Sequence, residues 1–95
     1  MVIISITLRV PQAEFEKFKP AIEALVKSSR QEPGVVSYTF AVDALDSELI
    51  RVFEVYMDQA ALDAHHASAH FQAWRPISSS YPRKERRIFD ATLRL

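Results

Sequence analysis

The spacing of apolar residues switches from the period of a strand to the period of a helix and back, twice along this chain. Apolar runs at 2–10, 35–42, 49–57 and 86–95 predict four strands. Helical spacing predicts one helix from about Ala13 to Gln31 and a second helical segment from Gln59 to about Trp74. The predicted order is therefore β-α-β-β-α-β.

Local signals define the ends of these elements. The run Glu32-Pro33-Gly34 is a stop signal, because proline cannot continue a helix and glycine can adopt a positive φ. Pro20 lies inside the first helix, where we expect a kink rather than a break because the apolar stripe keeps its phase. Asp58 is a predicted N-cap, and Ser68 is predicted to cap a second short helix. The second helical segment should therefore be split.

This element order predicts an α+β, ferredoxin-like sandwich in which the whole chain, residues 1–95, forms one domain. The strands at 35–42 and 49–57 have apolar side chains on both faces, but helices can cover only one face. The other face would be an unusually large exposed apolar patch. We therefore expect a homodimer that pairs through its sheet faces, with a barrel-like core between the two sheets.

The composition argues against several classes of protein. Twelve basic residues balance twelve acidic ones, and no RNA-recognition motif is present, so nucleic-acid binding is not expected. The chain has no cysteine, which excludes disulfides and thiolate metal sites. The apolar start, Met1 to Ile6, is too short for a membrane span. We expect a cytoplasmic protein without membrane contact.

The segment 61–74 concentrates the residues best suited to chemistry. It contains all three histidines and the only tryptophan, in the run A-L-D-A-H-H-A-S-A-H-F-Q-A-W. Histidine is the side chain whose charge changes nearest neutral pH, and tryptophan offers a large flat surface with one N–H donor. We therefore expect this segment to form one wall of a small-molecule site.

Three segments resemble the antibiotic biosynthesis monooxygenase family of the quinol monooxygenase type. They are E-P-G-V-V-S-Y at 32–38, F-E-V-Y at 53–56 and the histidine-rich run at 61–74. The most specific match is H-x-x-S-x-H-F at 65–71. The resemblance implies a dimeric α/β barrel with a pocket between sheet and helices in each protomer. Tyr56 departs from the family pattern, which commonly has tryptophan there.

The resemblance also implies an activity. Oxygenases of this family use no metal, haem or flavin, because the deprotonated aromatic substrate itself passes an electron to O₂. The expected function is thus cofactor-independent oxidation of a small or polycyclic aromatic hydroquinone or phenol. The similar haem-degrading enzymes use an asparagine, and this chain has none. Two alternatives stay open: an isomerase of a small carbonyl compound, and a non-catalytic dimeric ligand-binding domain.

Seven residues are candidates for the site, with His65 as the leading proton-transfer group. The predicted catalytic residues are His65, Glu54 and His70, and the predicted substrate-binding residues are Trp74, Tyr56, Tyr38 and Phe71. Each has a structural alternative. His65 could close a helix end, and the aromatic rings could pack in the core or at the dimer face. Glu54 would orient His65 in the functional interpretation and could instead join an ion pair between protomers.

No metal or other cofactor is predicted. His66 and His70 are four residues apart, a spacing that allows metal ligation on a continuous helix. Ser68 interrupts that helix, and no third ligand is close in sequence. His70 by itself is expected to pack or cap near Ser68.

Overall fold

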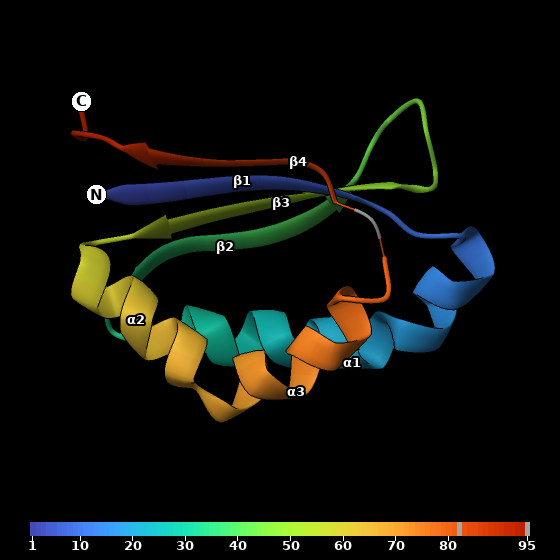
Figure 1. The fold of residues 1–95 in the computed structure, drawn as a ribbon, viewed down its shortest axis with the longest axis horizontal. Coiled ribbons are helices and arrows are strands. Elements are labelled where there is room, and N and C mark those ends of the chain that lie inside the picture. The colour runs from blue at the N-terminus through green and yellow to red at the C-terminus, as the bar shows by residue number, and fades with distance from the viewer. Residues whose placement is uncertain (82, 95) are drawn as a thin grey trace.

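The computed structural model describes residues 1–81 and 83–94 and shows one layer of helices against one sheet (Figure 1). The elements are β1 (Val2–Arg9), α1 (Gln12–Arg30), β2 (Val35–Val42), β3 (Leu49–Tyr56), α2 (Gln59–Ala67), α3 (Ala69–Ser78) and β4 (Arg83–Asp90). The strands form an antiparallel sheet in the order β2-β3-β1-β4. The predicted ferredoxin-like α+β fold is confirmed. In the single chain the sheet is open and does not close into a barrel.

The strand register decides which side chains face the helices. Glu54 pairs with Ile4 on one side and with Tyr38 on the other, so these three side chains lie in one row across the sheet. All three are buried. Tyr56, two residues beyond Glu54, shares their face and is completely enclosed. Phe53 and Met57 therefore point to the opposite face, where they are exposed.

The helix α1 runs through Pro20 without a break and ends at Arg30. Its buried face includes Ile22 and Leu25, which pack with Tyr38 and Trp74 in one of the core clusters. Within the described residues, neither this helix nor any other combines the length and apolarity needed to cross a bilayer.

The break between α2 and α3 occurs where the sequence predicts it. The Asp58 side chain caps α2 by accepting from the backbone N–H of Ala61. The Ser68 hydroxyl accepts from the backbone N–H of Phe71 and donates to the backbone oxygen of His65 at 2.6 Å. Both predicted caps are confirmed. The serine hydroxyl thus stabilises the end of one helix and the start of the next.

The last strand differs from the predicted 86–95. It begins at Arg83 and ends at Asp90, whose partner Val2 is the first residue of β1. Beyond it, Ala91 N–H donates to the Met1 oxygen and the Met1 amino group donates to the Ala91 oxygen. Met1 lies directly before β1, which begins at Val2, so β1 offers no partner further along. The predicted strand position of Leu95 lies outside the described residues.

Gly34 does not use the positive φ that glycine allows. The stop signal nevertheless ends the helix, and β2 begins at Val35 directly after it. What the glycine provides is room, because the chain passes very close to Ala61 of α2 there.

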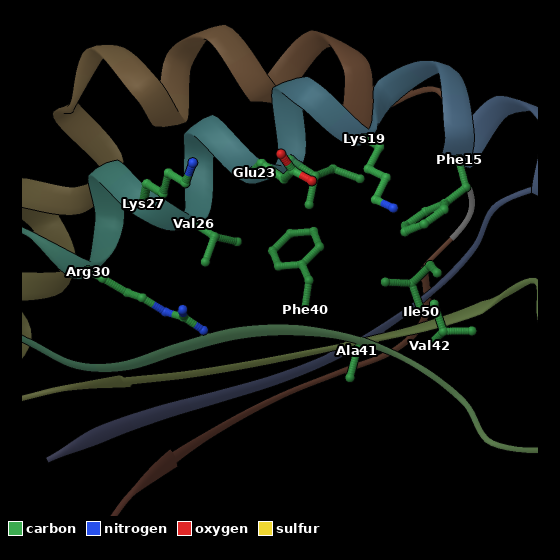
Figure 2. Close-up of a pocket in the computed structure, with 11 residues that line it drawn as sticks. Phe15, Lys19, Glu23, Val26, Lys27, Arg30, Phe40, Ala41, Val42 and Ile50 are labelled. Atoms are coloured by element: carbon green, nitrogen blue, oxygen red, sulfur yellow. The ribbon is translucent and has the colours of Figure 1, made fainter.

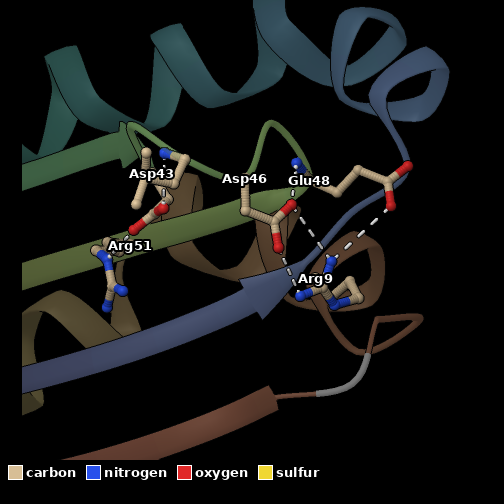
Figure 3. A network of polar contacts seen from close by, with 6 residues as sticks. Arg9, Asp43, Asp46, Glu48 and Arg51 are labelled. Carbon is tan, nitrogen blue, oxygen red and sulfur yellow. Dashed lines mark hydrogen bonds and ion pairs between the residues drawn. The ribbon is translucent and has the colours of Figure 1, made fainter.

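Ion pairs hold the hairpin between β2 and β3 (Figure 3). Arg9 of β1 donates to Asp46 at 2.8 Å, and Arg51 of β3 donates to Asp43 at 3.0 Å. The hydrogen bond from Arg9 is the main reason why the pKa of Asp46 lies below its ordinary value. For Asp43 the main cause of a lowered pKa is the backbone N–H of Leu45, followed by Arg51.

Candidate active site

A small cavity lies between the helix-facing side of the sheet and α3. Its volume is about 80 Å³. It is lined by Ile6, Leu8, Tyr38, Phe40, Val52, Glu54, Phe71, Trp74, Arg75 and Ser78. Four of the seven predicted site residues are therefore brought together here: Tyr38, Glu54, Phe71 and Trp74.

Glu54 is the carboxylate of this cavity. It is only 6% exposed, and its Oε1 accepts a 2.5 Å hydrogen bond from the hydroxyl of Tyr56. The two residues are two apart on β3, so their side chains leave the same face of the strand. A buried carboxylate is costly unless polar groups satisfy it, and the tyrosine hydroxyl does so. Tyr56 supports Glu54 and does not itself line the cavity.

Both tyrosines stay protonated near neutral pH. Burial raises the pKa of Tyr56 well above its ordinary value, and the charge of Glu54 raises it further. Burial is also the main cause of the raised pKa of Tyr38, again with a contribution from Glu54. Tyrosine hydroxyls in these surroundings act as hydrogen-bond donors, so Glu54 is the better proton acceptor.

His65 lies behind the cavity wall. It is completely buried and does not line the cavity, but its ring contacts Tyr38 and Phe71, with both ring centroids 5.1 Å away. Its Nδ1 lies 2.7 Å from an oxygen of Glu32. Its Nε2 is buried without a hydrogen-bond partner in the described structure. The carboxylate that orients His65 is thus Glu32, and not Glu54, which the sequence offered as one of two alternatives for that residue.

Glu32 joins the two helices through their histidines. Its Oε2 lies 2.7 Å from His65 Nδ1 and 2.7 Å from His70 Nε2. Residues five apart on a continuous helix would point about 140° away from each other. The break at Ser68 therefore allows both rings to reach one oxygen. Sequence reasoning missed Glu32 because it used the E-P-G run as a helix stop signal and as part of the family resemblance, and assigned no role to the carboxylate.

The same three residues are the group that could hold a metal ion. One ligand atom from each of Glu32, His65 and His70 lies within 4.8 Å of the others. Two imidazoles and a carboxylate suit divalent transition metals. In the present geometry the carboxylate oxygen serves as a shared hydrogen-bond acceptor, which requires N–H on His65 Nδ1 and His70 Nε2. His66, the histidine considered from its spacing to His70, is not a member of this group.

Arg75 is a cavity residue that was not predicted. It lies on α3 next to Trp74, is exposed, and contributes the cation of the cavity lining. A cation near Glu54 can stabilise a negatively charged ligand or intermediate. The sequence signal that could have identified Arg75 is its position directly after Trp74, at the end of the histidine-rich run.

The family model and one similar crystal structure name the same family. The family model for antibiotic biosynthesis monooxygenase matches residues 1–76. The Synechocystis protein sll1783 is 30% identical over 70 residues, which is 74% of this chain but 48%, about half, of that protein. The crystal structure of an antibiotic biosynthesis monooxygenase is 27% identical, with a TM-score of 0.81 over 98% of this chain and 100% of that one. Protein PA3566 from Pseudomonas aeruginosa is 28% identical, with a TM-score of 0.76 over 99% and 93% of the two chains. The match over 1–76 assigns this chain to the antibiotic biosynthesis monooxygenase family.

Proposed function

We propose that this protein is a cofactor-independent monooxygenase that oxidises an aromatic hydroquinone or phenol with O₂. The observation that carries the proposal is the place of Glu54, a buried carboxylate in a cavity walled by Tyr38, Phe71 and Trp74. The aromatic walls suit a flat ring, and the carboxylate suits its hydroxyl group. Family membership and the monooxygenase relative support the same reaction class.

In the proposed reaction, Glu54 removes the hydroxyl proton of the bound substrate. The resulting phenolate passes an electron to O₂, and recombination of the two radicals forms the new C–O bond. One hydroquinone and one O₂ then give one hydroxyquinone and one water, so the substrate supplies all the electrons that O₂ takes up. Arg75 stabilises the developing negative charge, and the enclosed apolar walls keep water away.

The volume of the cavity favours a single aromatic ring over a polycyclic substrate. The cavity measures about 80 Å³. An engineered protein cavity that binds benzene measures about 150 Å³. Even one ring therefore requires a wall residue to move. Phe40 is the suitable one, because it is only half-buried and also borders a larger groove on its other side.

We assign His65 and His70 a positioning role in this proposal. Through Glu32 they fix α2 and α3, and α3 carries Phe71 and Trp74. His65 as the proton-transfer group is the competing assignment. It would need the substrate to pass Tyr38 or Phe71, whose rings both contact His65.

The test is oxygen uptake with a panel of single-ring and polycyclic hydroquinones, in buffer that contains a chelator. Glu54→Gln should lower kcat by a factor of about 10² or more, since a general base typically contributes about 10²–10⁴-fold. Glu48→Gln is the matched control on the same hairpin, because Glu48 lies at the ion pairs around Arg9, away from the cavity. His65→Gln should keep substantial activity in the folded fraction.

Three results would contradict the proposal. Full activity of Glu54→Gln together with an inactive, folded His65→Gln protein would move proton transfer to His65. Loss of oxygen uptake in the chelator would point to a metal at Glu32, His65 and His70. Product formation without oxygen would favour the isomerase alternative.

A further inference from the structure

A second, larger hollow lies on the other side of Phe40, between α1 and the edge strand β2. Its volume is about 310 Å³, within the usual range for small-molecule sites of roughly 300–1,000 Å³. Figure 2 shows the Phe40 ring in the middle of this groove, Arg30 at one end and Lys19 at the other. The groove is separate from the cavity that holds Glu54, which lines only the smaller one.

The floor and walls of the groove are apolar. They are formed by Phe15, Ile22 and Val26 of α1 and by Phe40, Ala41, Val42 and Ile50 of the sheet. Val42 is 46% exposed at the sheet edge, so water covers apolar surface here. A ligand with an apolar body would displace that water at a gain in free energy.

The rim of the groove is cationic. Lys19, Lys27 and Arg30 border it, against the single carboxylate of Glu23. None of these four side chains forms an ion pair with another residue in the described parts of the chain. The Nε of Arg30 donates to the backbone oxygen of Tyr38 at 2.9 Å, which fixes the guanidinium beside the groove and leaves its terminal nitrogens for a ligand.

We propose that this groove binds an apolar molecule with one carboxylate, its body on Phe40 and Val26 and its carboxylate at Arg30. A net positive rim over an apolar floor matches an amphipathic anion in both respects, and guanidinium pairs well with a planar carboxylate. This site does not depend on the proposed oxygenation. A strand from a second copy of the chain is the other possible occupant of the β2 edge, and charged groups along an edge oppose such pairing.

The probe is 2-naphthoate, with the neutral isostere 2-naphthylmethanol as its partner, and binding is measured by calorimetry at low salt. We expect the anion to bind more tightly than the alcohol and the difference to shrink as salt rises. Arg30→Gln and Lys27→Gln should each weaken naphthoate binding, Arg30→Gln by about three- to ten-fold, because Lys27 lies beside Arg30 in the groove. Glu23→Gln should strengthen binding, because it removes the opposing charge.

Lys17→Gln is the matched control, since Lys17 lies on α1 over the ring of Phe18 and does not line the groove. All of these residues are exposed, so the variants should fold. Equal affinity for acid and alcohol, equal effects of Lys17→Gln and Lys27→Gln, or no binding at millimolar concentration would each overturn the proposal. Association of the chain in solution that Val42→Glu abolishes and naphthoate does not affect would assign the groove to a second copy.

Discussion

A Cβ atom on Gly34 would lie 2.3 Å from the Cβ of Ala61. Real Cβ atoms essentially never approach so closely, so the start of β2 and the first turns of α2 can touch only because residue 34 has no side chain. This contact fixes α2, whose last turn carries His65, against the segment that leads from α1 into β2.

We expect Gly34→Ala to destabilise the protein by roughly 1–3 kcal/mol, the usual cost of overpacking. The measurement is urea unfolding. Adding Ala61→Gly to Gly34→Ala should recover part of that loss, because the clashing methyl group is removed. Ala60→Gly, an exposed neighbour on α2, reports the helix-propensity cost alone, about 1 kcal/mol. A Gly34→Ala protein as stable as the wild type would show that the backbone moves apart freely.

Removal of Glu32 should lower stability through the two histidines. Glu32→Ala leaves the buried Nδ1–H of His65 without an acceptor, which costs about 1–3 kcal/mol. Glu16→Ala, an exposed glutamate of α1, should change stability by no more than about 0.5 kcal/mol. Chemical unfolding measures both. Indistinguishable midpoints for the two variants would mean that the contacts of Glu32 contribute nothing.

Tyr56→Phe should shift the pH dependence of the proposed reaction. The Tyr56 hydroxyl donates to Glu54 Oε1 and stabilises the charged carboxylate, so the carboxylate should be harder to ionise without this bond. The base must be ionised, so the acidic limb of the kcat/KM profile should move to higher pH, with the plateau largely kept. Tyr81→Phe removes a hydroxyl that bonds Glu14 instead and should leave the profile in place. A shift toward lower pH would contradict the assignment of Glu54.

The hairpin ion pairs should give an acid-sensitive contribution to stability. The folded-state pKa of Asp46 is depressed, mainly by Arg9, so its contribution is present above the unfolded pKa and is lost as pH falls through the folded pKa. Arg9→Gln should raise the pKa of Asp46, and carboxyl NMR titration can follow it. Asp43, held by Leu45 and Arg51, serves as the internal reference. An unchanged Asp46 titration in Arg9→Gln would show that the pair is too solvated to matter.

The uncovered face of the sheet should pair with a second copy. Phe53, Met57 and Phe89 are between 45% and 58% exposed, and the strand register puts Phe53 and Met57 opposite the helices. We expect a dimer at micromolar concentration in sedimentation analysis and a monomer for Phe53→Glu. Leu45→Glu should leave the dimer intact, because Leu45 is 98% exposed in the hairpin loop. A monomeric wild-type protein would contradict the predicted dimer with its barrel-like core between the two sheets.

The order of elements was predictable because each segment has a clear period of apolar residues and the caps at Asp58 and Ser68 are local signals. The last strand was placed too late because its end is set by its partner β1 rather than by its own alternation. Which face of β3 meets the helices could not be predicted, since both faces are apolar. The register with Ile4 and Tyr38 decides it.

The sequence indicated which residues form the site, but it indicated less well which of them contact one another. The cavity collects Tyr38, Glu54, Phe71 and Trp74 from two strands and a helix, all of which the sequence indicated. The link between Glu32 and His65 spans 33 positions in the sequence, and only the packed fold brings them together. No local pattern in the E-P-G run distinguishes a carboxylate that ends a helix from one that orients an imidazole.

Phe40 borders two pockets, the small cavity at Glu54 and the larger groove at Arg30. The Phe40 ring therefore forms a common wall between the two pockets. A ligand that displaces the Phe40 ring from one pocket reduces the volume of the other pocket. By thermodynamic reciprocity, each ligand then lowers the binding affinity of the other by the same factor. Two molecules competing for this protein need not resemble each other in shape or charge, nor ever occupy the same atoms' positions.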